Sequence, residues 1–237
     1  MKLSPQSLLV FTLCAAFLTA AGAEKPTFRK NNNSPIAVTS KSDDSLNSGH
    51  EESFQESLAK LHIPDDYKLE EIVIGNERAP HTVVIYLSFT CSHCGDFFNG
   101  EFQEIRKKYV NAGVIKMYLR SYLDDIGALE AASIVRCLAG KSSNMVLELS
   151  QKVFANQEEW RKSKNPREFL KDIFKVYGKS KIEDCCKSKK ISAGLMKEQQ
   201  RAHELKIIEV PAFVVDGEVY HGKLTCEKLG KILKRGR

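Results

Sequence analysis

The sequence predicts an α/β domain whose sheet is interrupted by a long run of helices. The apolar run "TVVIYL" precedes a stretch with helical spacing, and a second apolar run, "GVIKMYLRSYL", follows it. This order of strand, helix and strand indicates a parallel sheet unit. Residues 126–206 then show helical patterns throughout, before two further strands near the end of the chain. The helices therefore divide one α/β domain into two parts.

The elements follow in order from these patterns. A short strand is expected near residues 69–74 and a buried strand near 82–89, with a turn at Gly75 and Asn76 between them. The next helix should begin at the cysteines of "SFTCSHCGDFF", because apolar residues recur at helical intervals through "CGDFFNGEFQEIRKKYV". The strand "GVIKMYLRSYL" completes the first part of the domain.

The sequence also predicts the helix boundaries within residues 126–206 and the elements that follow them. Breaks are expected near Gly140, at "KNP" and near Gly178. The segment "VPAFVVDGEVYHG" predicts two strands joined by a turn at Asp216 and Gly217, and a last helix should begin at about Thr225.

The first 23 residues predict a secretory signal peptide. The apolar segment "LLVFTLCAAFLTAAGA" is short for a bilayer span, and small residues precede a cleavage point after Ala23. Cleavage would also remove Cys14. An uncleaved membrane anchor is the alternative, and a lipid anchor on Cys14 is the weaker one because "FTLC" lacks a run of small residues. We therefore expect a periplasmic or secreted protein.

Residues 24–50 have the composition of a flexible tether, with few groups that could pack. Residues 51–63 then predict an amphipathic helix, because Phe54, Leu58 and Leu61 recur at helical intervals. The apolar face of this helix needs a partner. It would pack either on the domain of its own chain, which we favour, or on further copies of the chain in a homo-oligomer.

Composition excludes some classes of function. The formal net charge is +6, and the lysines are spread along the helical stretches and the tail "KILKRGR". No basic patch with interleaved aromatic residues and no nucleic-acid motif is present, so we expect no nucleic-acid partner.

The pair Cys91 and Cys94 predicts redox chemistry rather than a metal site. A structural zinc ion needs four ligands, usually from two such pairs, and the sequence has no second CxxC. A disulfide across so short a loop would remove little chain entropy, so a purely structural bridge is a poor explanation. We therefore expect a reactive dithiol and neither a metal nor a cofactor.

The residues around the pair would adjust its thiolate. A helix that starts at Cys91 directs free amide groups and its positive dipole end at the first sulfur. His93, when protonated, would add a positive charge and make the disulfide a stronger oxidant. Ser92 and His93 are therefore the candidate tuning residues, although a solvated loop position for His93 remains an alternative.

Three segments carry a family resemblance, namely "IVIGNERAP", "VVIYLSFTCSHCGDFF" and "EVPAFVVDGEVYHG". In this order and at this spacing, the sequence resembles the DsbA branch of the thioredoxin superfamily, the periplasmic thiol:disulfide oxidoreductases. The resemblance implies a thioredoxin fold with an inserted all-helical domain. Residues 64–125 and 207–237 would form the two parts of the thioredoxin fold, and residues 126–206 the insertion.

The resemblance also assigns roles. It implies that Cys91 is the exposed attacking sulfur, Cys94 the buried resolving one, and Pro211 the family's cis-proline. The backbone of Val210 would then be exposed where an extended substrate strand could pair with it. An ordinary trans proline at the start of an edge strand is the alternative for Pro211.

Two positions depart from the family. Ser92 stands where members commonly have proline. Ile85 stands where members often have a buried acid, six residues before the first cysteine. Such an acid takes protons from the buried thiol, so we expect proton transfer here to depend on solvent or on another group.

The remaining cysteines suggest a second disulfide. Proteins similar to this one carry such a bridge in the inserted region, which implies a Cys137–Cys185 pair, with Cys186 as the rival partner of Cys137. Cys226 and the unused neighbour are left over, and they could be buried, pair with each other or bond to another chain.

The sequence therefore predicts an exported oxidoreductase that introduces disulfides into reduced secreted proteins, with reoxidation by a membrane redox partner implied by the family. A disulfide isomerase that assembles through residues 51–63 is the closest alternative. A binding protein that uses the thioredoxin fold only as a scaffold is a second alternative, from a different class of function.

Overall fold

A computed structural model of the chain describes Phe54, Leu58, Ile63 and residues 67–235. The predicted signal peptide and tether lie outside the described residues. Among the residues that are described, no helix is long and apolar enough to cross a membrane.

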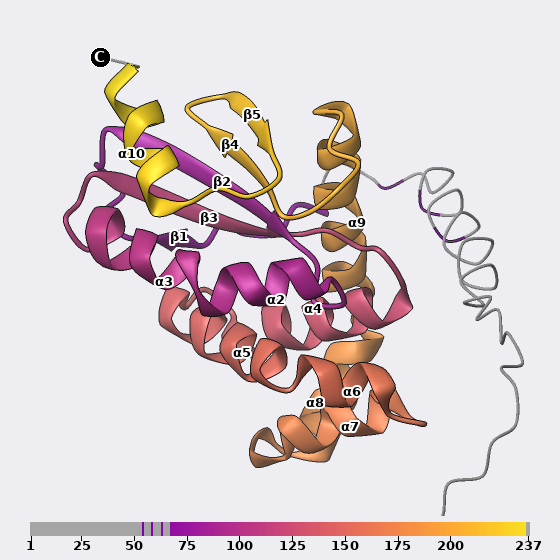
Figure 1. The fold of residues 1–237 in the computed structure, drawn as a ribbon. Helices are drawn as coiled ribbons and strands as arrows, with labels where there is room; N and C mark the ends of the chain where they lie inside the picture. Colours follow the sequence, from indigo (N-terminus) through magenta and orange to yellow (C-terminus); the bar gives the residue numbers. More distant parts are fainter. Residues whose placement is uncertain (1–53, 55–57, 59–62, 64–66, 236–237) are drawn as a thin grey trace, which may run out of the picture. The chain divides into compact units, whose positions relative to one another are not determined.

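A five-stranded sheet in the order β1-β3-β2-β4-β5 forms the centre of the fold (Figure 1). Its strands are β1 (Val73–Ile74), β2 (His81–Leu87), β3 (Ile115–Ser121), β4 (Ala212–Val215) and β5 (Glu218–His221). Strands β2 and β3 run parallel, as the strand, helix and strand order predicts, while the other neighbours are antiparallel. The predicted first strand is shorter than expected, since only its last two residues pair with β3.

Strand β2 is the middle of the sheet, and its sequence explains why. Valine, isoleucine, tyrosine and leucine side chains follow one another, which suits a strand that is covered on both faces. Ile85 pairs with Leu119 on one side and Phe213 on the other, and all solvent is excluded from its side chain. The end of β2 therefore leads the chain from the core directly to Cys91.

The helical segment between β2 and β3 has three parts. They are α2 (Ser92–Asn99), α3 (Glu101–Ile105) and a π-helical turn, η1 (Arg106–Val110). The sequence predicts one continuous helix here, and that expectation is wrong at Gly100. This glycine has φ −112° and ψ −99°, outside the helical region, so the chain changes direction between α2 and α3.

The long helical stretch forms an insertion between β3 and β4. Most of it lies below the sheet in Figure 1, while its last helix stands beside the sheet. Its helices are α4 (Ile126–Ala139), α5 (Ser143–Ala155), α6 (Gln157–Lys162), α7 (Pro166–Ile173), α8 (Lys179–Lys187) and α9 (Lys189–Glu204), with a 3₁₀ turn, η2 (Lys175–Tyr177), before α8. Gly140 and Gly178 both have positive φ where helices end, as expected for glycine. A further break falls at Ser188, whose side chain caps α9 by accepting the Ile191 amide.

Helix α9 ties the insertion to the end of strand β3. The Glu198 carboxylate accepts the Ser121 amide at 3.1 Å, and the Gln199 side chain accepts the Leu123 amide at 2.8 Å. Burial raises the pKa of the Glu198 carboxyl group, while the positive charges of nearby Arg136 and Arg120 act to lower it. These bonds fix the loop that leaves β3 beside the cysteine pair.

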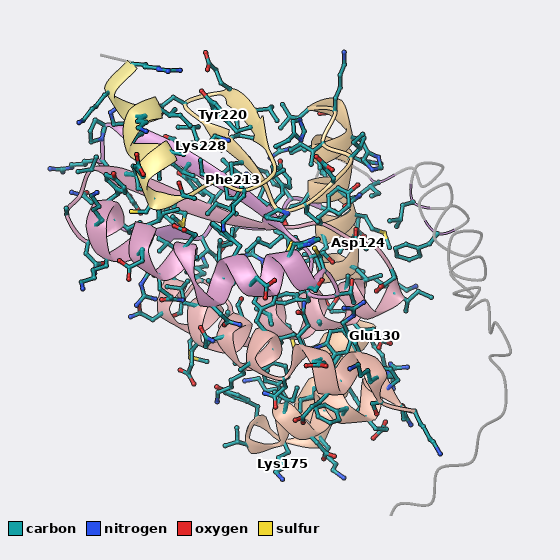
Figure 2. All side chains as sticks on the ribbon, viewed as in Figure 1. Asp124, Glu130, Lys175, Phe213, Tyr220 and Lys228 are labelled. Carbon is teal, nitrogen blue, oxygen red and sulfur yellow. A yellow bond between two sulfur atoms is a disulfide. The ribbon has the colours of Figure 1, made fainter. Side chains whose placement is uncertain are left out.

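The C-terminal hairpin and helix α10 (Cys226–Arg235) complete the fold. Asp216 and Gly217 form the expected turn between β4 and β5, and both have positive φ. Figure 2 shows Tyr220 on this hairpin and Lys175 on the insertion at opposite ends of the described fold. The side chain of Phe213 is fully buried in the main core.

Only part of the predicted helix at residues 51–63 is described. Phe54 and Leu58 are helical, and Leu58 is 4% exposed within the main hydrophobic core. Phe54 packs against the same core. The two side chains therefore contact the chain's own core, which is the packing that we favoured for this apolar face.

Candidate redox site at the start of helix α2

Cys91 and Cys94 lie where strand β2 passes into helix α2. Cys91 occupies the N-cap position with φ −79° and ψ 119°, and its carbonyl accepts the amides of Cys94 and Gly95 at 3.1 and 3.2 Å. The helix therefore begins at the pair, and the backbone amides of His93 and Cys94 act on the first sulfur. Both thiols are free.

Cys94 is the inaccessible member of the pair. Its side chain is fully buried, and its sulfur accepts the backbone amide of Ser88 at 3.4 Å. Burial strongly raises the pKa of the Cys94 thiol, and the neighbouring Cys91 sulfur raises it further. Cys94 therefore remains a thiol at neutral pH when Cys91 loses its proton.

Cys91 is the accessible member, half-buried at the surface. Its pKa is lowered to about 7, chiefly because the Cys94 thiol donates a hydrogen bond to its sulfur. The backbone amides of Cys94 and His93 lower the pKa further, while burial opposes them. Cys91 is therefore partly ionised at neutral pH, and the thiolate is the form that reacts.

Asp124 is a carboxylate that sequence reasoning did not connect with the site. Asp124 lies in the loop between β3 and α4 and is labelled in Figure 2. Its negative charge acts to raise the pKa of Cys94 and partly offsets the lowering of the pKa of Cys91. Burial raises the pKa of Tyr122, and the charge of Asp124 raises it further. No sequence pattern indicates this proximity, because it depends on how α9 holds the end of β3.

Val210 and Pro211 meet the pair from a distant part of the chain. The Cys91 thiol donates to the Val210 carbonyl at 3.4 Å, and the Val210–Pro211 peptide bond is cis. The structure therefore brings together four of the residues singled out in the sequence, Cys91, Cys94, Val210 and Pro211.

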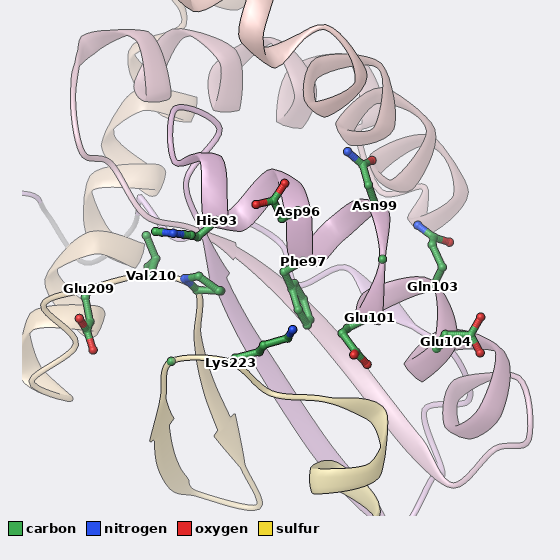
Figure 3. A pocket seen from close by; sticks show the side chains of 13 residues that line it. His93, Asp96, Phe97, Asn99, Glu101, Gln103, Glu104, Glu209, Val210 and Lys223 are labelled. Carbon is green, nitrogen blue, oxygen red and sulfur yellow. The ribbon is translucent and has the colours of Figure 1, made fainter.

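The two residues between the cysteines are exposed. His93 lowers the pKa of Cys91 through its backbone amide, and its ring lines a groove that continues along α2 (Figure 3). The charge effect that we expected from the ring of His93 therefore stays a prediction, as does the influence of Ser92 on the loop.

Gln157 is a second residue that sequence reasoning missed. From the first position of α6 its amide nitrogen donates to the carbonyls of Phe89 and Cys91, both at 2.8 Å. Gln157 is buried, and a β-carbon at Gly95 would lie 2.5 Å from its side-chain oxygen. The inserted helices thus hold the backbone of the cysteine loop directly.

Four further cysteines lie in the described part of the chain. A disulfide joins Cys137 of α4 to Cys185 of α8, while Cys186 and Cys226 are free. Burial raises the pKa of both free thiols, so both are poorly reactive at neutral pH. Within residues 67–235 and the three described residues before them, no group of three or more His, Cys, Asp or Glu side chains could hold a metal ion.

The fold and the dithiol together define a thioredoxin-fold protein with a CxxC pair and a helical insertion. The family model described as "Thioredoxin" matches residues 68–235, and the chain belongs to this family. The predicted fold class, a thioredoxin fold with an inserted helical region, is confirmed by this match and by the solved structures that share the architecture.

Two solved structures illustrate the shared fold. Wolbachia pipientis α-DsbA1 has a TM-score of 0.63 and 20% identity, covering 75% of this chain and 93% of its own. A protein-disulfide isomerase from Novosphingobium aromaticivorans has a TM-score of 0.58 and 19% identity, covering 70% and 91% respectively. At these identities the likeness concerns the fold alone.

A similar sequence comes from Rickettsia prowazekii (strain Madrid E). That protein, named "Putative protein-disulfide oxidoreductase", is 31% identical over 150 residues, which cover 62% of this chain and 54% of the relative. The chain thus spans about half the length of the curated relatives that it matches.

Proposed function

We propose that this protein is an exported thiol:disulfide oxidoreductase that donates the Cys91–Cys94 disulfide to reduced secreted proteins. The observation that carries the proposal is the asymmetry of the pair. Cys91 is accessible and has a pKa of about 7, whereas Cys94 is fully buried with a raised pKa. Such a pair exposes one sulfur to a substrate and protects the other.

The reaction follows from this asymmetry. A substrate thiolate attacks the Cys91 sulfur of the disulfide, and the bond between the two protein sulfurs breaks. The released Cys94 sulfur takes up a proton, since its raised pKa favours the thiol. A second substrate thiolate then attacks the substrate sulfur of the mixed disulfide and releases Cys91 as a thiolate. The substrate loses two electrons and the protein pair gains them.

Val210 would position the substrate for the first attack. Its carbonyl lies 3.4 Å from the Cys91 sulfur, so an extended substrate segment that pairs with this backbone places its own cysteine beside Cys91. Reoxidation of the pair is assigned, as a further part of the proposal, to a membrane redox partner in the periplasm.

One observation favours a second candidate, disulfide isomerisation. A pKa lowered to about 7 leaves Cys91 partly ionised at neutral pH in the reduced protein. An isomerase uses such a thiolate to attack misplaced disulfides. Self-association through residues 51–63 would accompany this role.

The reduction potential of the purified protein tests the direction. The pair is equilibrated in glutathione buffers, the free thiols are alkylated, and the oxidised fraction is measured. We expect a value well above the roughly −270 mV of thioredoxin. A value at or below that of thioredoxin would contradict disulfide donation.

A substrate assay tests the reaction itself. The oxidised protein should convert a reduced peptide with two cysteines into its disulfide. Cys94→Ser, charged at Cys91 with a small disulfide, should accumulate a mixed disulfide with a peptide that has a single cysteine, because that peptide has no second thiol to release Cys91. Cys91→Ser should do neither. Sedimentation of the chain with and without residues 24–63 then separates the two candidates, because a monomer in both cases speaks against the isomerase.

A further inference from the structure

A groove of about 860 Å³ opens beside the reactive pair and follows helix α2 toward α3 (Figure 3). One end is formed by Val210 and Pro211, whose backbone lies next to Cys91. Phe97 lines the middle of the groove. A substrate segment that reaches Cys91 therefore has a continuous surface on which to extend.

The charges in this groove differ from those of the whole chain. The chain carries a formal net charge of +6, yet the groove is lined by four carboxylates and one ammonium group. The carboxylates belong to Asp96, Glu101, Glu104 and Glu209, and the ammonium to Lys223. Acidic groups are thus gathered in a groove that adjoins the reactive sulfur.

The carboxylates differ in how freely they could meet a ligand. Glu101 is half-buried, and one of its oxygens accepts the amide of Cys226 at 2.8 Å, so it also holds the start of α10. Asp96, Glu104 and Glu209 are exposed. Figure 3 shows Glu209 beyond Val210 at one end of the groove and Glu104 at the other. A ligand along the groove would pass acidic groups over its whole length.

We propose that this groove selects substrate segments in which basic side chains flank the reactive cysteine. The inference rests on the proposed function and names the substrate class for the same site. Helix α2 rises by about 1.5 Å per residue and an extended peptide by about 3.3 Å, so Asp96 lies two to three peptide residues from Cys91. Lysine or arginine within roughly five residues of the cysteine would therefore reach the carboxylates.

The expected size of the effect follows from exposed ion pairs. Each such pair changes affinity by roughly 1.5- to 5-fold, and the change falls as salt screens the charges. Three to four carboxylates should therefore give a preference of about tenfold for a basic over an acidic peptide at low ionic strength.

Three capped peptides with one central cysteine test the proposal. They carry lysine, glutamine or glutamate at the third and fifth positions on both sides of the cysteine. Stopped-flow measurement gives the rate at which each reduces the oxidised protein. Each rate is divided by the rate of the same peptide with hydroxyethyl disulfide, which is uncharged, because neighbouring charges also change the reactivity of the peptide thiol.

We expect the normalised rate to fall from the lysine to the glutamine to the glutamate peptide, and the spread to shrink toward unity in about 1 M salt. The triple variant Asp96→Asn, Glu104→Gln, Glu209→Gln should lose most of the preference. The matched control is Glu77→Gln, Asp172→Asn, Asp184→Asn, which removes three exposed carboxylates outside the groove and should keep it.

Equal normalised rates for the three peptides would overturn the inference while leaving the proposed function intact. So would a preference that survives in the groove variant. If no peptide reduces the oxidised protein, the proposed function fails together with the inference. The salt dependence of the unmodified protein provides the same test without any substitution.

Discussion

The two cysteine pairs of this protein differ in what surrounds them. Cys137 and Cys185 join two helices of the insertion, and Cys185 is fully buried. Cys91 and Cys94 lie at the start of a helix, where amide groups and a neighbouring thiol lower the pKa of one sulfur. The same residue type is thus structural in one region and reactive in the other, and the difference comes from backbone position and access.

Disulfide exchange by the reactive pair should be abolished when the accessible sulfur of Cys91 is removed. We expect Cys91→Ser to reduce disulfide exchange with a peptide substrate to the uncatalysed rate, because no other described thiol combines access with a lowered pKa. The measurement is the rate of peptide oxidation. Cys226→Ser is the control and should keep full activity, since burial raises the pKa of that thiol. Residual exchange in Cys91→Ser would show that a second thiol shares the reaction.

Removal of the structural pair Cys137 and Cys185 should lower the stability of the protein and leave its activity intact. Replacing Cys137 and Cys185 together by alanine removes a bridge between residues 48 apart, which should cost about 4 kcal/mol of unfolding free energy in the chain-entropy model. Activity per folded molecule should persist below the new melting temperature. Chemical denaturation gives the free energy, and Cys186→Ala serves as the neighbouring control.

A loss of peptide oxidation in the folded Cys137→Ala, Cys185→Ala variant would contradict this division of roles. It would mean that the bridge in the insertion takes part in the redox reaction.

Gln157 links the inserted helices to the cysteine loop, so removing its side-chain amide should lower both the stability of the protein and the rate of exchange. Gln157→Leu leaves the buried carbonyl of Phe89 and that of Cys91 without this donor, and we expect a loss of about 2 kcal/mol. The rate of exchange should also fall, because the cysteine loop would be held less firmly. Gln151→Leu is the matched control, since that amide bonds to Asn99 at the surface. Equal losses in the two variants would argue against a specific link through Gln157.

Part of this architecture could be predicted from the sequence, because it is recorded in local patterns. Apolar periodicity predicted the strands on either side of α2, and the Asp216-Gly217 pair predicted the turn between β4 and β5. The break at Gly100 was missed, since the apolar spacing continues across it while one glycine changes the backbone direction. Composition also gave no hint that Ser188 starts a new helix by capping it.

The candidate site was predictable only where its chemistry lies in adjacent residues. Cys91 and Cys94 are close in sequence, and a family pattern suggested Pro211. Gln157 and Asp124 come from elements whose approach depends on tertiary packing, so no spacing in the sequence indicates them. The sequence shows Ile85 where related proteins often have a buried acid. The carboxylate that acts to raise the pKa of both sulfurs is instead Asp124, in the loop between β3 and α4.

The smallest expected effect concerns that carboxylate. Asp124 raises the pKa of Cys91, so Asp124→Asn should lower that pKa from about 7, by a few tenths of a unit to one unit. The rate of alkylation of the reduced protein follows the thiolate fraction, and its midpoint should therefore move to lower pH. At pH 6 the variant should react up to several times faster than the unmodified protein.

Asp172→Asn on α7 is the matched control for this shift, because it removes an exposed carboxylate on the insertion. Its alkylation midpoint should stay at about 7. The charge of Asp124 also raises the pKa of Cys94, so in Asp124→Asn the released Cys94 sulfur should hold its proton less tightly during exchange. An unchanged or higher midpoint in Asp124→Asn would mean that this carboxylate does not act on the pair, and that the pKa of Cys91 is set within its own helix.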